Sequence, residues 1–586
     1  MKQRLEYVFD VEREALWRYV ADTDWINRHS GLPPIGARIE AQRDGSTKRY
    51  ARFWSGPFTN EWEELPTLWR APEFYEIERR YTRGVPRRFV NRTSLESLGP
   101  SRTKVVSEIE VEPRNFLMGL VLPLVMMQGK IGADRAFALA AKLAVRGSGD
   151  DRIRGSNAFA GLAAGGISQP AIAALDRLLA ESDEGQLATI RPYEVADRYG
   201  IPRREMLRAC LAATRAGLFN LRWDVICPSC RGNSNSFDSL AEMRGDLHCA
   251  NCNVPYGPQF DRSVEVTFNA RPMGRGIDVP LFCIASPHRS SHVLAQTPLP
   301  AHGRETLRVT LEPGTYDINA VGIALTPFIA GGDDRSPAQA TVADARVDFP
   351  HEIAAGEATV AVSNTLDRPA IVRIENGRWP DTIATAASVT ALQEFRDMFS
   401  SEVLAPGLEL GVESMAILFT DLLGSTAMYS KAGDAPAFRI VTDHFTRLRP
   451  IIEAGEGAIV KTIGDAVMAV FSSPGRCLAA ALQMDDAVRD LEHDGVPLRL
   501  RVGFAIGPCI AMRANEKIDY FGTTVNLAAR LEAKAGAGEV TMTRNAAERD
   551  DVREILRASG RDTTVERLPV KGFAADVEVV RVLAPK

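Results

Sequence analysis

The spacing of apolar and polar residues changes several times along the chain, and each change predicts a different set of elements. The first part begins with a strand-like stretch, LEYVFDV, and a helical one, REALWRYVADTDWINRHSG. Alternating stretches such as KRYARFW, FYEIERRYT and TKVVSEIEVE follow, and a helical run through GADRAFALAAKLAV closes the segment. We therefore expect a strand, helices, antiparallel strands and a long terminal helix within residues 1–145.

The most hydrophobic stretch of the chain is FLMGLVLPLVMMQGK, which begins at Phe116. It is short for a membrane span and contains Pro123, so we expect a buried helix and no transmembrane segment. The element order of residues 1–145, with its aromatic LWRYVADTDWINRHSG segment, resembles the START-like helix-grip fold. This resemblance implies a cavity for a hydrophobic or lipid ligand, and a packed core without a ligand is the alternative.

Residues 146–167 are rich in Gly, Ser and Ala, which predicts a linker. Residues 168–223 then follow the pattern helix, turn at Gly200, helix from Pro202 and strand, which resembles a winged helix. Between Pro192 and Arg222 there are six arginines against three acids. That excess is weak for DNA binding, so we expect a structural or protein-contact role and no nucleic-acid partner.

Four of the eight cysteines form two pairs with the spacing C-x2-C-x18-C-x2-C. Such pairs can direct four thiolates at one ion while the residues between them form a ribbon, so we predict a zinc ribbon over residues 224–257. Four protein ligands leave no open position, so the zinc would be structural; two unrelated turns are the alternative. The predicted ligands are Cys227, Cys230, Cys249 and Cys252.

Residues 258–386 alternate with period two between Pro, Gly, Asp and Asn turns, which predicts an antiparallel β-sandwich-like domain without recognisable chemistry. The stretch VTALQEFRDMFSSEVL then predicts a helical connector of about four turns within residues 387–412.

Composition bounds the class of protein. With 586 residues, 45% hydrophobic and 25% charged, the chain is typical of a globular protein of several domains. A net charge of −5 gives no reason to expect bulk electrostatic binding to nucleic acid or to an anionic membrane. The N-terminal residues do not resemble a secretory signal, and the cysteine usage fits a reducing compartment, so we expect a cytoplasmic protein.

The candidate chemistry lies in residues 413–586. An apolar strand in MAILFTDLLGST ends at Asp421, and the chain then turns through Gly424, Ser425 and Thr426 into a helix. A strand, a loop of small residues and a helix N-terminus together present backbone N–H groups suited to phosphate oxygens. We therefore expect a phosphate-binding loop here.

Charged residues follow at specific places in this segment. In VKTIGDAVMAVF two apolar strands meet at a turn that contains Asp465, and Lys461 lies inside the first strand. Farther on, the chain runs from Asp519 into a helix on which Asn526 and Arg530 share one face. Singly, these residues would be turn residues or solvated charges. Interleaved strands and helices with antiparallel hairpins predict an α+β, ferredoxin-like fold.

The stretches FTDLLGST, VKTIGDAVMAVF and DYFGTTVNLAAR resemble, in order and spacing, the motifs of the class III adenylate/guanylate cyclase catalytic domain. That family cyclises ATP to cyclic AMP with release of pyrophosphate, at sites shared between two subunits. The resemblance therefore implies a homodimer and a regulatory N-terminal portion. It also makes Lys571, in LPVKGF, a candidate phosphate contact.

The resemblance assigns roles to six residues. Asp421 and Asp465 would hold two Mg²⁺ or Mn²⁺ ions, which stabilise negative charge on the attacking and leaving oxygens. Arg530 would stabilise the five-coordinate phosphorus, and Asn526 would orient the ribose. Lys461 and Asp519 would recognise the base. These are the residues Asp421, Lys461, Asp465, Asp519, Asn526 and Arg530.

The identity of the two base-recognising residues favours ATP. Adenine presents an acceptor at N1 and a donor at its 6-amino group, and the side chains of Lys461 and Asp519 complement both. A cyclase acting on GTP or on a pyrimidine nucleotide is one alternative. A DNA-binding regulator that uses a cyclase-like domain for dimerisation is the other. Because Lys461 lies up to roughly 13 Å from Asp465 along an extended strand, we expect the two residues to serve different half-sites.

Overall fold

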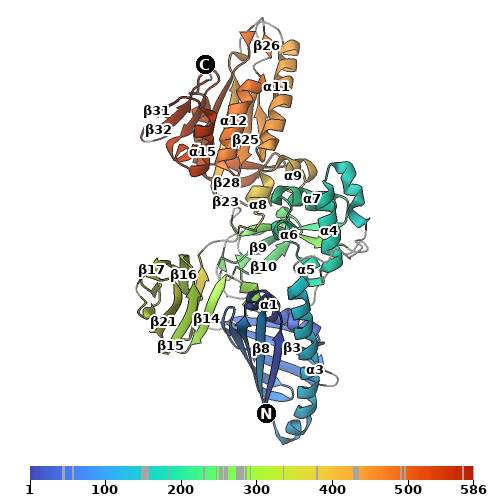
Figure 1. The fold of residues 1–586 in the computed structure, drawn as a ribbon. Helices are drawn as coiled ribbons and strands as arrows, with labels where there is room; N and C mark the ends of the chain where they lie inside the picture. Colours follow the sequence, from blue (N-terminus) through green and yellow to red (C-terminus); the bar gives the residue numbers. More distant parts are fainter. Residues whose placement is uncertain are drawn as a thin grey trace.

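The computed structural model describes residues 1–586 except 42–46, 56–57, 147–156, 183, 229–230, 246, 250–254, 257–261, 272–282, 284–286, 291, 334, 378–380, 426–433, 489–490, 494–495, 571–572, 574 and 585–586. Figure 1 shows the N-terminal unit at one end of the molecule, the sheet of the C-terminal unit at the other, and a group of short helices between them. A second β-rich unit lies beside the N-terminal one.

The N-terminal unit wraps an antiparallel sheet around helices in the expected element order. The first strand, β1, pairs with the last, β8, and Leu16, Val20 and Phe137 lie in the core between the helices and the sheet. Its elements are β1 (Lys2–Phe9), α1 (Arg13–Val20), α2 (Thr23–His29), β2 (Gly36–Ala41), β3 (Thr47–Ser55), β4 (Phe58–Glu64), β5 (Leu68–Arg70), β6 (Phe74–Arg83), β7 (Pro86–Gly99), β8 (Arg102–Pro113) and α3 (Phe116–Arg146).

The two halves of α3 differ in their surroundings. The second half packs into the core through Ala136 and Phe137, and Gly132 lies so close to the backbone of Ser30 that no side chain fits between them. The first half is mostly exposed, and Phe116 keeps 81% of its surface in solvent. The prediction of a buried helix is therefore wrong for this half, because only Leu122 and Met126 are buried against β7 and β8, and Met118 is partly buried beside them.

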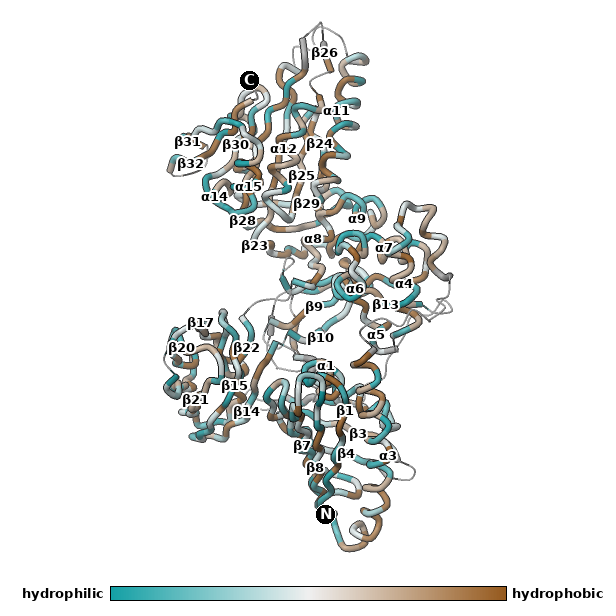
Figure 2. The backbone as a smooth tube through the Cα atoms, in the orientation of Figure 1, coloured by the Kyte–Doolittle hydropathy of each residue, from teal (hydrophilic) through white to brown (hydrophobic). Residues whose placement is uncertain are grey.

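Among the described residues α3 is also the one helix long and apolar enough to cross a membrane, by length and composition alone. Figure 2 shows its first turns coloured as apolar at the end of the molecule farthest from the C-terminal unit.

The central unit contains the helices expected for residues 168–223. Helix α6 ends at Gly200, whose φ of 68° closes it with a left-handed turn. Part of the predicted linker is ordered, because η1 buries Phe159 against Phe219. The elements are η1 (Asn157–Gly165), α4 (Gln169–Glu181), α5 (Glu184–Ala188), α6 (Pro192–Tyr199), α7 (Arg203–Arg215), β9 (Phe219–Ile226), β10 (Asn233–Phe237), η2 (Leu240–Glu242), β11 (Leu247–His248), β12 (Pro255–Tyr256) and β13 (Val264–Ala270).

Strand β13 pairs with β9 in the order β10-β9-β13, so it belongs to the central unit although its sequence was placed in the β-rich segment. All seven of its residues are buried, because both the helices of the central unit and the connector pack against this strand.

The β-rich unit packs two sheets around one core. One sheet contains β14 (Val293–Leu299), β16 (Gly314–Ala320), β17 (Thr326–Gly332), β20 (Glu352–Ala354) and β22 (Ala370–Asn376). The other contains β15 (Arg304–Leu311), β18 (Ala338–Val342), β19 (Val347–Asp348) and β21 (Gly356–Asn364), and the short helix η4 (Pro287–Ser290) precedes both. Strand β14 also pairs with β5, which joins this sheet to the N-terminal one.

The connector differs from the single helix that was predicted. It forms two short helices, α8 (Ala386–Thr390) and α9 (Gln393–Met398), because Leu392 is extended and buried between them. The guanidinium of Arg396 donates to the carbonyl of Thr390 and thereby satisfies one backbone acceptor at the break.

The C-terminal unit is a mixed sheet with the strand order β24-β25-β23-β28-β30-β32-β31. Helices α11 and α12 cover one face, and α13 with the connector covers the other. Its elements are β23 (Leu410–Leu422), α11 (Asp434–Ala454), β24 (Gly457–Ile463), β25 (Ala466–Phe471), α12 (Pro474–Val488), β26 (Glu492–His493), β27 (Val496–Pro497), β28 (Leu500–Ala514), β29 (Lys517–Phe521), α13 (Thr523–Glu532), β30 (Val540–Thr543), α14 (Arg544–Ala547), α15 (Asp550–Ser559), β31 (Thr563–Leu568) and β32 (Val577–Val582).

Candidate active site

Asp421 lies near the end of β23, directly opposite Arg501 on the neighbouring strand β28. Residues opposite one another share a face of the sheet, and their side chains form an ion pair. The Nε of Arg501 lies 3.2 Å from Oε1 of Glu532, at the end of α13. One guanidinium therefore joins two carboxylates that are far apart in the sequence.

Asp465 lies at the turn between β24 and β25, as expected, and follows Gly464, whose φ of 65° needs little energy only in glycine. Its Oδ2 is buried and accepts no hydrogen bond within the described part of the chain. Its charge acts on both Arg501 and Glu532, so Asp465 belongs to the same cluster as Asp421.

The pKa of Glu532 is raised to about 7, chiefly by burial; Arg501 lowers this pKa, and the negative charges of Asp421 and Asp465 raise it. Three carboxyl groups thus surround one guanidinium, and an orphaned carboxylate oxygen lies among them. Such an excess of hard oxygen donors fits a divalent cation. Among the described residues, no group of three or more His, Cys, Asp or Glu side chains lies close enough together to hold a metal ion by itself.

Helix α13 lies directly on β28 because that strand has glycine at the two positions beneath it. A side chain at Gly503 would collide with the backbone of Glu532, and one at Gly507 would lie 2.8 Å from Thr524 Oγ1. Asn526 on this helix is exposed and Arg530 is half-buried. Both are therefore accessible to a ligand on the helix face where they were predicted.

Lys461 and Asp519 form an ion pair, with 2.6 Å between Nζ and Oδ2, although 58 residues separate them. A β-bulge at Val460 shifts the register of β24 immediately before Lys461. The side chain of Asp519 is 12% exposed, and its other oxygen accepts from the amide of Tyr520 at 2.8 Å. An ammonium donor and a carboxylate acceptor thus lie side by side at the edge of the site.

The cluster of Asp421 and Asp465 and the pair of Lys461 and Asp519 are separate groups. No hydrogen bond or ion pair between the described residues joins one to the other.

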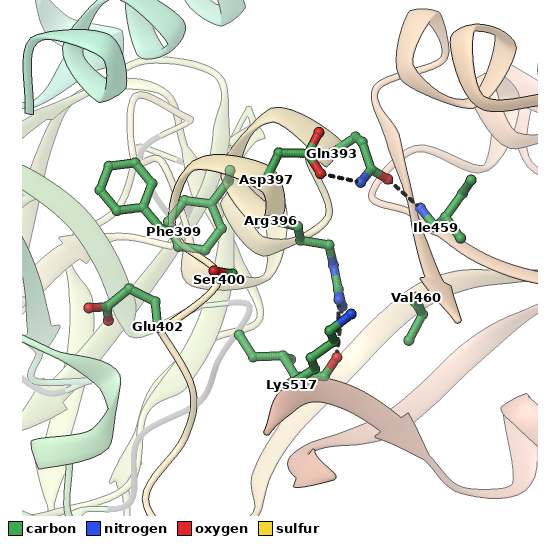
Figure 3. A pocket seen from close by; sticks show the side chains of 11 residues that line it. Gln393, Arg396, Asp397, Phe399, Ser400, Glu402, Ile459, Val460 and Lys517 are labelled. Carbon is green, nitrogen blue, oxygen red and sulfur yellow. Dashed lines mark hydrogen bonds between the residues drawn. The ribbon is translucent and has the colours of Figure 1, made fainter. Parts of the chain in front are cut away.

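The connector holds both strands that carry the Lys461–Asp519 pair. Arg396 donates two hydrogen bonds, of 2.9 and 3.1 Å, to the carbonyl of Ile518, and the amide of Ile459 donates to Gln393 at 2.8 Å. Figure 3 shows these contacts around an open pocket between α9 and the edge of the sheet. Helix α9 is thus bonded to Ile518, which directly precedes Asp519, and to Ile459, which lies two residues before Lys461.

Several predicted residues lie elsewhere. Gly424 and Ser425 follow β23 at the expected loop, and Gly424 has a φ of 83°. Cys227 and Cys249 are both fully buried. Four predicted residues lie outside the described part of the chain: Thr426, Lys571, Cys230 and Cys252.

The sequence analysis missed Arg501 and Glu532. Lys461 was recognised as a basic residue within an apolar strand. Arg501, within the stretch LRLRVGFA, gives the same signal. Glu532 gives no such signal, since it follows Arg530 on an ordinary helical pattern.

Comparison with known proteins agrees with the motifs. Residues 410–578 match the family model described as the adenylate and guanylate cyclase catalytic domain, so this segment is a nucleotide cyclase catalytic domain. Residues 158–280 match a family of unknown function (DUF5939), which covers the central unit together with β13.

Among the curated relatives, an uncharacterized protein of Mycobacterium bovis is 38% identical over 125 residues, covering 21% of this chain and 30% of that protein. Atrial natriuretic peptide receptor 2 of Homo sapiens is 34% identical over 141 residues, covering 21% of this chain and 13% of the receptor. The matches therefore span less than a third of these relatives. Among solved structures, the adenylyl cyclase CyaB from P. aeruginosa is 21% identical, with 30% of this chain and 97% of that chain covered and a TM-score of 0.26.

Proposed function

We propose that the protein is an adenylate cyclase that converts ATP to 3′,5′-cyclic AMP and pyrophosphate at the interface of a homodimer. The observation that carries this proposal is the adjacent pair of Lys461 and Asp519. The lysine donates to N1 of adenine and the aspartate accepts from its 6-amino group, whereas guanine presents a donor at N1 and an acceptor at O6. A base that leaves buried polar groups without a hydrogen-bond partner binds much more weakly, so this pair discriminates strongly between nucleotides.

The charged cluster of Asp421 and Asp465 with Arg501 and Glu532 suits the attack on the α-phosphate. Asp421 and Asp465 would hold two Mg²⁺ or Mn²⁺ ions, which supply positive charge at the reacting phosphate when bound. Asn526 orients the ribose, and Arg530 places a guanidinium against the charge that develops on the α-phosphate. The loop at Gly424 and Ser425, with Thr426 and Lys571, binds the remaining phosphates.

Turnover of each nucleotide by the purified full chain tests the substrate. We expect cyclic AMP from ATP with Mg²⁺ or Mn²⁺, and Lys461→Ala should lower kcat/KM for ATP by about 100-fold. Lys517→Ala removes an exposed lysine from the same region and is the matched control. Lys461→Ala turning over ATP as well as Lys517→Ala does would contradict the base assignment.

GTP is the second candidate substrate, because a relative from Caenorhabditis elegans, 27% identical over 145 residues, is named a receptor-type guanylate cyclase. The same assay separates the two: faster turnover of GTP than of ATP would replace the adenylate proposal and retain the cyclase. A pyrimidine triphosphate forms the third arm of this assay.

The arginines of α7 argue against a DNA-binding regulator. Arg204 donates to Glu394 at 2.8 Å and to the carbonyl of Glu453 at 2.7 Å, and Arg208 lies 3.5 Å from Glu394. Arg203 pairs with Asp197 at 2.7 Å. These charges hold the central unit to the connector and the catalytic domain, so the winged-helix-like segment serves contact within the chain.

A structural zinc site is also proposed for the central unit. The backbone turns tightly after Cys227, where the amide of Arg231 donates to the Cys227 carbonyl at 2.8 Å with Arg231 at a φ of 49°. Turns of this kind direct two thiolates at one ion, and the burial of Cys249 is compatible with a second pair. Zinc analysis of the purified protein should give one ion per chain, and Cys227→Ser should lose it.

The N-terminal unit is proposed as a sensor for a hydrophobic or lipid ligand that shifts the catalytic dimer between two packings. Cyclase activity of the full chain is compared with that of the same chain after hydrophobic ligands are added. Activity that no such ligand changes would count against the sensor without affecting the catalytic proposal.

A further inference from the structure

The first half of α3 exposes apolar side chains on every side of the helix except the one that carries Met118, Leu122 and Met126. From Phe116 to Gly129 the sequence contains no charged residue. Only Leu122 and Met126 are buried, at 3% and 6% exposure. The exposed side chains are Phe116 81%, Leu117 67%, Leu120 66%, Val121 45%, Leu124 54%, Val125 44%, Met127 54% and Ile131 46%. A helix that is apolar all round is normally enclosed by protein or by lipid, and an exposed apolar patch marks a surface for interaction with protein or membrane.

The length of this stretch fits the surface of a bilayer and not its full thickness. Fourteen uncharged residues, Phe116 to Gly129, span about 21 Å at 1.5 Å per residue, whereas a membrane core is about 30 Å thick. The same helix continues into the folded core, where Gly132 lies against Ser30 and Phe137 is 3% exposed. The first half therefore cannot enter a bilayer deeply without withdrawing the second half from the core.

Basic residues surround the start of the apolar stretch. Arg114 precedes α3 and donates to the carbonyls of Tyr81 and Gly84, which fixes the helix beside the turn between β6 and β7. Arg83 and Arg87 at that turn are exposed and form no ion pair with any described residue.

Two acids lie beside these arginines, and each pairs with another arginine: Glu112 lies 3.6 Å from Arg88, and Glu61, opposite Arg83 on β4, lies 3.8 Å from Arg38. At the other end of the stretch, Lys130 pairs with Asp134. Among the described residues, the charged side chains at the start of the patch that form no ion pair are therefore the cationic ones of Arg83, Arg87 and Arg114.

The sign of this charge favours one partner. In a symmetric contact between two copies of the chain, a self-complementary patch needs both signs of charge, and here cationic residues would meet across the axis. An anionic lipid surface attracts these arginines and accepts the apolar side chains between its acyl chains.

We propose that the first half of α3, with Arg83, Arg87 and Arg114, docks the protein peripherally onto an anionic phospholipid bilayer. Insertion of these side chains removes their surface from water, and the arginines meet the lipid headgroups. The contact lies at the end of the molecule opposite the catalytic domain (Figure 2), so docking would leave that domain away from the bilayer.

Co-sedimentation of the full chain with vesicles tests the proposal. The wild type should sediment with phosphatidylcholine vesicles that contain phosphatidylglycerol, less with phosphatidylcholine alone, and less as salt is added. The triple variant Leu117→Glu, Leu120→Glu, Leu124→Glu should bind more than about tenfold more weakly, since burial of each leucine contributes about tenfold in affinity.

Two further variants sharpen the test. Arg83→Glu with Arg87→Glu should weaken binding to the anionic vesicles by more than about tenfold and leave the neutral ones unchanged. The control Leu325→Glu with Val565→Glu introduces the same kind of charge at exposed apolar positions, 48% and 55% exposed, on other units and should bind as the wild type does.

The proposal is overturned if wild-type protein does not sediment with anionic vesicles, a result that needs no variant to fold. It is equally overturned if the leucine variant, with a circular dichroism spectrum like that of the control, binds as well as the control. Sedimentation equilibrium without vesicles tests the rival occupant: leucine substitutions that dissociate a dimer would assign the patch to a second copy of the chain.

Discussion

Gly503 and Gly507 determine how closely α13 approaches the sheet that carries the aspartates. Because the strand presents no side chain there, the helix rests on the backbone of β28. This close approach brings Glu532, at the end of α13, within 3.2 Å of Arg501 and places Asn526 and Arg530 along the edge of the site.

Gly503→Ala should therefore displace α13 and abolish most of the cyclase activity, with a loss of stability of about 1–3 kcal/mol from overpacking. Activity and the unfolding midpoint are compared with those of Gly411→Ala, since a methyl group at Gly411 meets no atom within 4 Å. Equal activity of the two variants would show that the close approach of α13 is not needed.

Glu532 should make stability depend on pH. Its folded pKa of about 7 lies above its ordinary value of 4.5, so between these values the folded state binds more protons than the unfolded state. The free energy of unfolding then falls as pH rises through this range. In metal-free buffer, Glu532→Gln should melt higher than the wild type at pH 8 and equally at pH 4.5, while the exposed Glu554→Gln should not alter the slope.

The motif residues could be predicted because each stands at a recognisable place in the sequence, such as the end of an apolar strand or the tip of a hairpin. The coupling of Arg501 with Asp421 and Glu532 could not. This coupling depends on the register of β23 with β28 and on how closely α13 packs against β28. Neither of these is visible as a local pattern in the sequence.

At the scale of elements, α9 links the central unit to the strands that carry the Lys461–Asp519 pair. Its Arg396 holds the backbone next to Asp519, and Gln393 holds the strand of Lys461. The connector was predicted as one helix because its apolar residues keep helical spacing through Leu392. The contacts with β24 and β29, made by residues more than 60 positions away, favour the break instead.

Arg396→Ala should release β29 and raise KM for ATP by about tenfold with a smaller change in kcat, because Arg396 positions Asp519 without touching the nucleotide. The preference for ATP over GTP should fall as well. Lys517→Ala, which lines the same pocket without bonding to α9 in the described structure, is the matched control. Unchanged selectivity in Arg396→Ala would separate the connector from base recognition.

At the scale of the whole molecule, the two groups of site residues predict a division of labour between subunits. Lys461→Ala and Asp465→Ala should each lose most of the activity when assayed alone. Mixed together they should recover about a quarter of wild-type activity, because half of the dimers are mixed and each has one complete site. Activity of the mixture is measured after heterodimers are demonstrated by differently tagged chains, and no recovery would contradict the split.

Element order was predictable along most of the chain, since periodicity and turn residues are local signals. The assignment of strands to sheets was not. Strand β13 joins β9, where the helices and the connector both pack against it, and β5 joins β14 across more than 220 residues. Such pairings depend on surfaces that exist only after each unit has folded.

The pairing of β5 with β14 limits where the chain can be cut. The amide of Ala71 donates to Leu294, and Gln296 donates to the carbonyl of Thr67 across the same seam. Deletion of residues 1–145 would strip β14 of this partner and leave an open sheet edge, which favours aggregation. A truncated protein suited to biochemical work should therefore keep the N-terminal and β-rich units together or remove both.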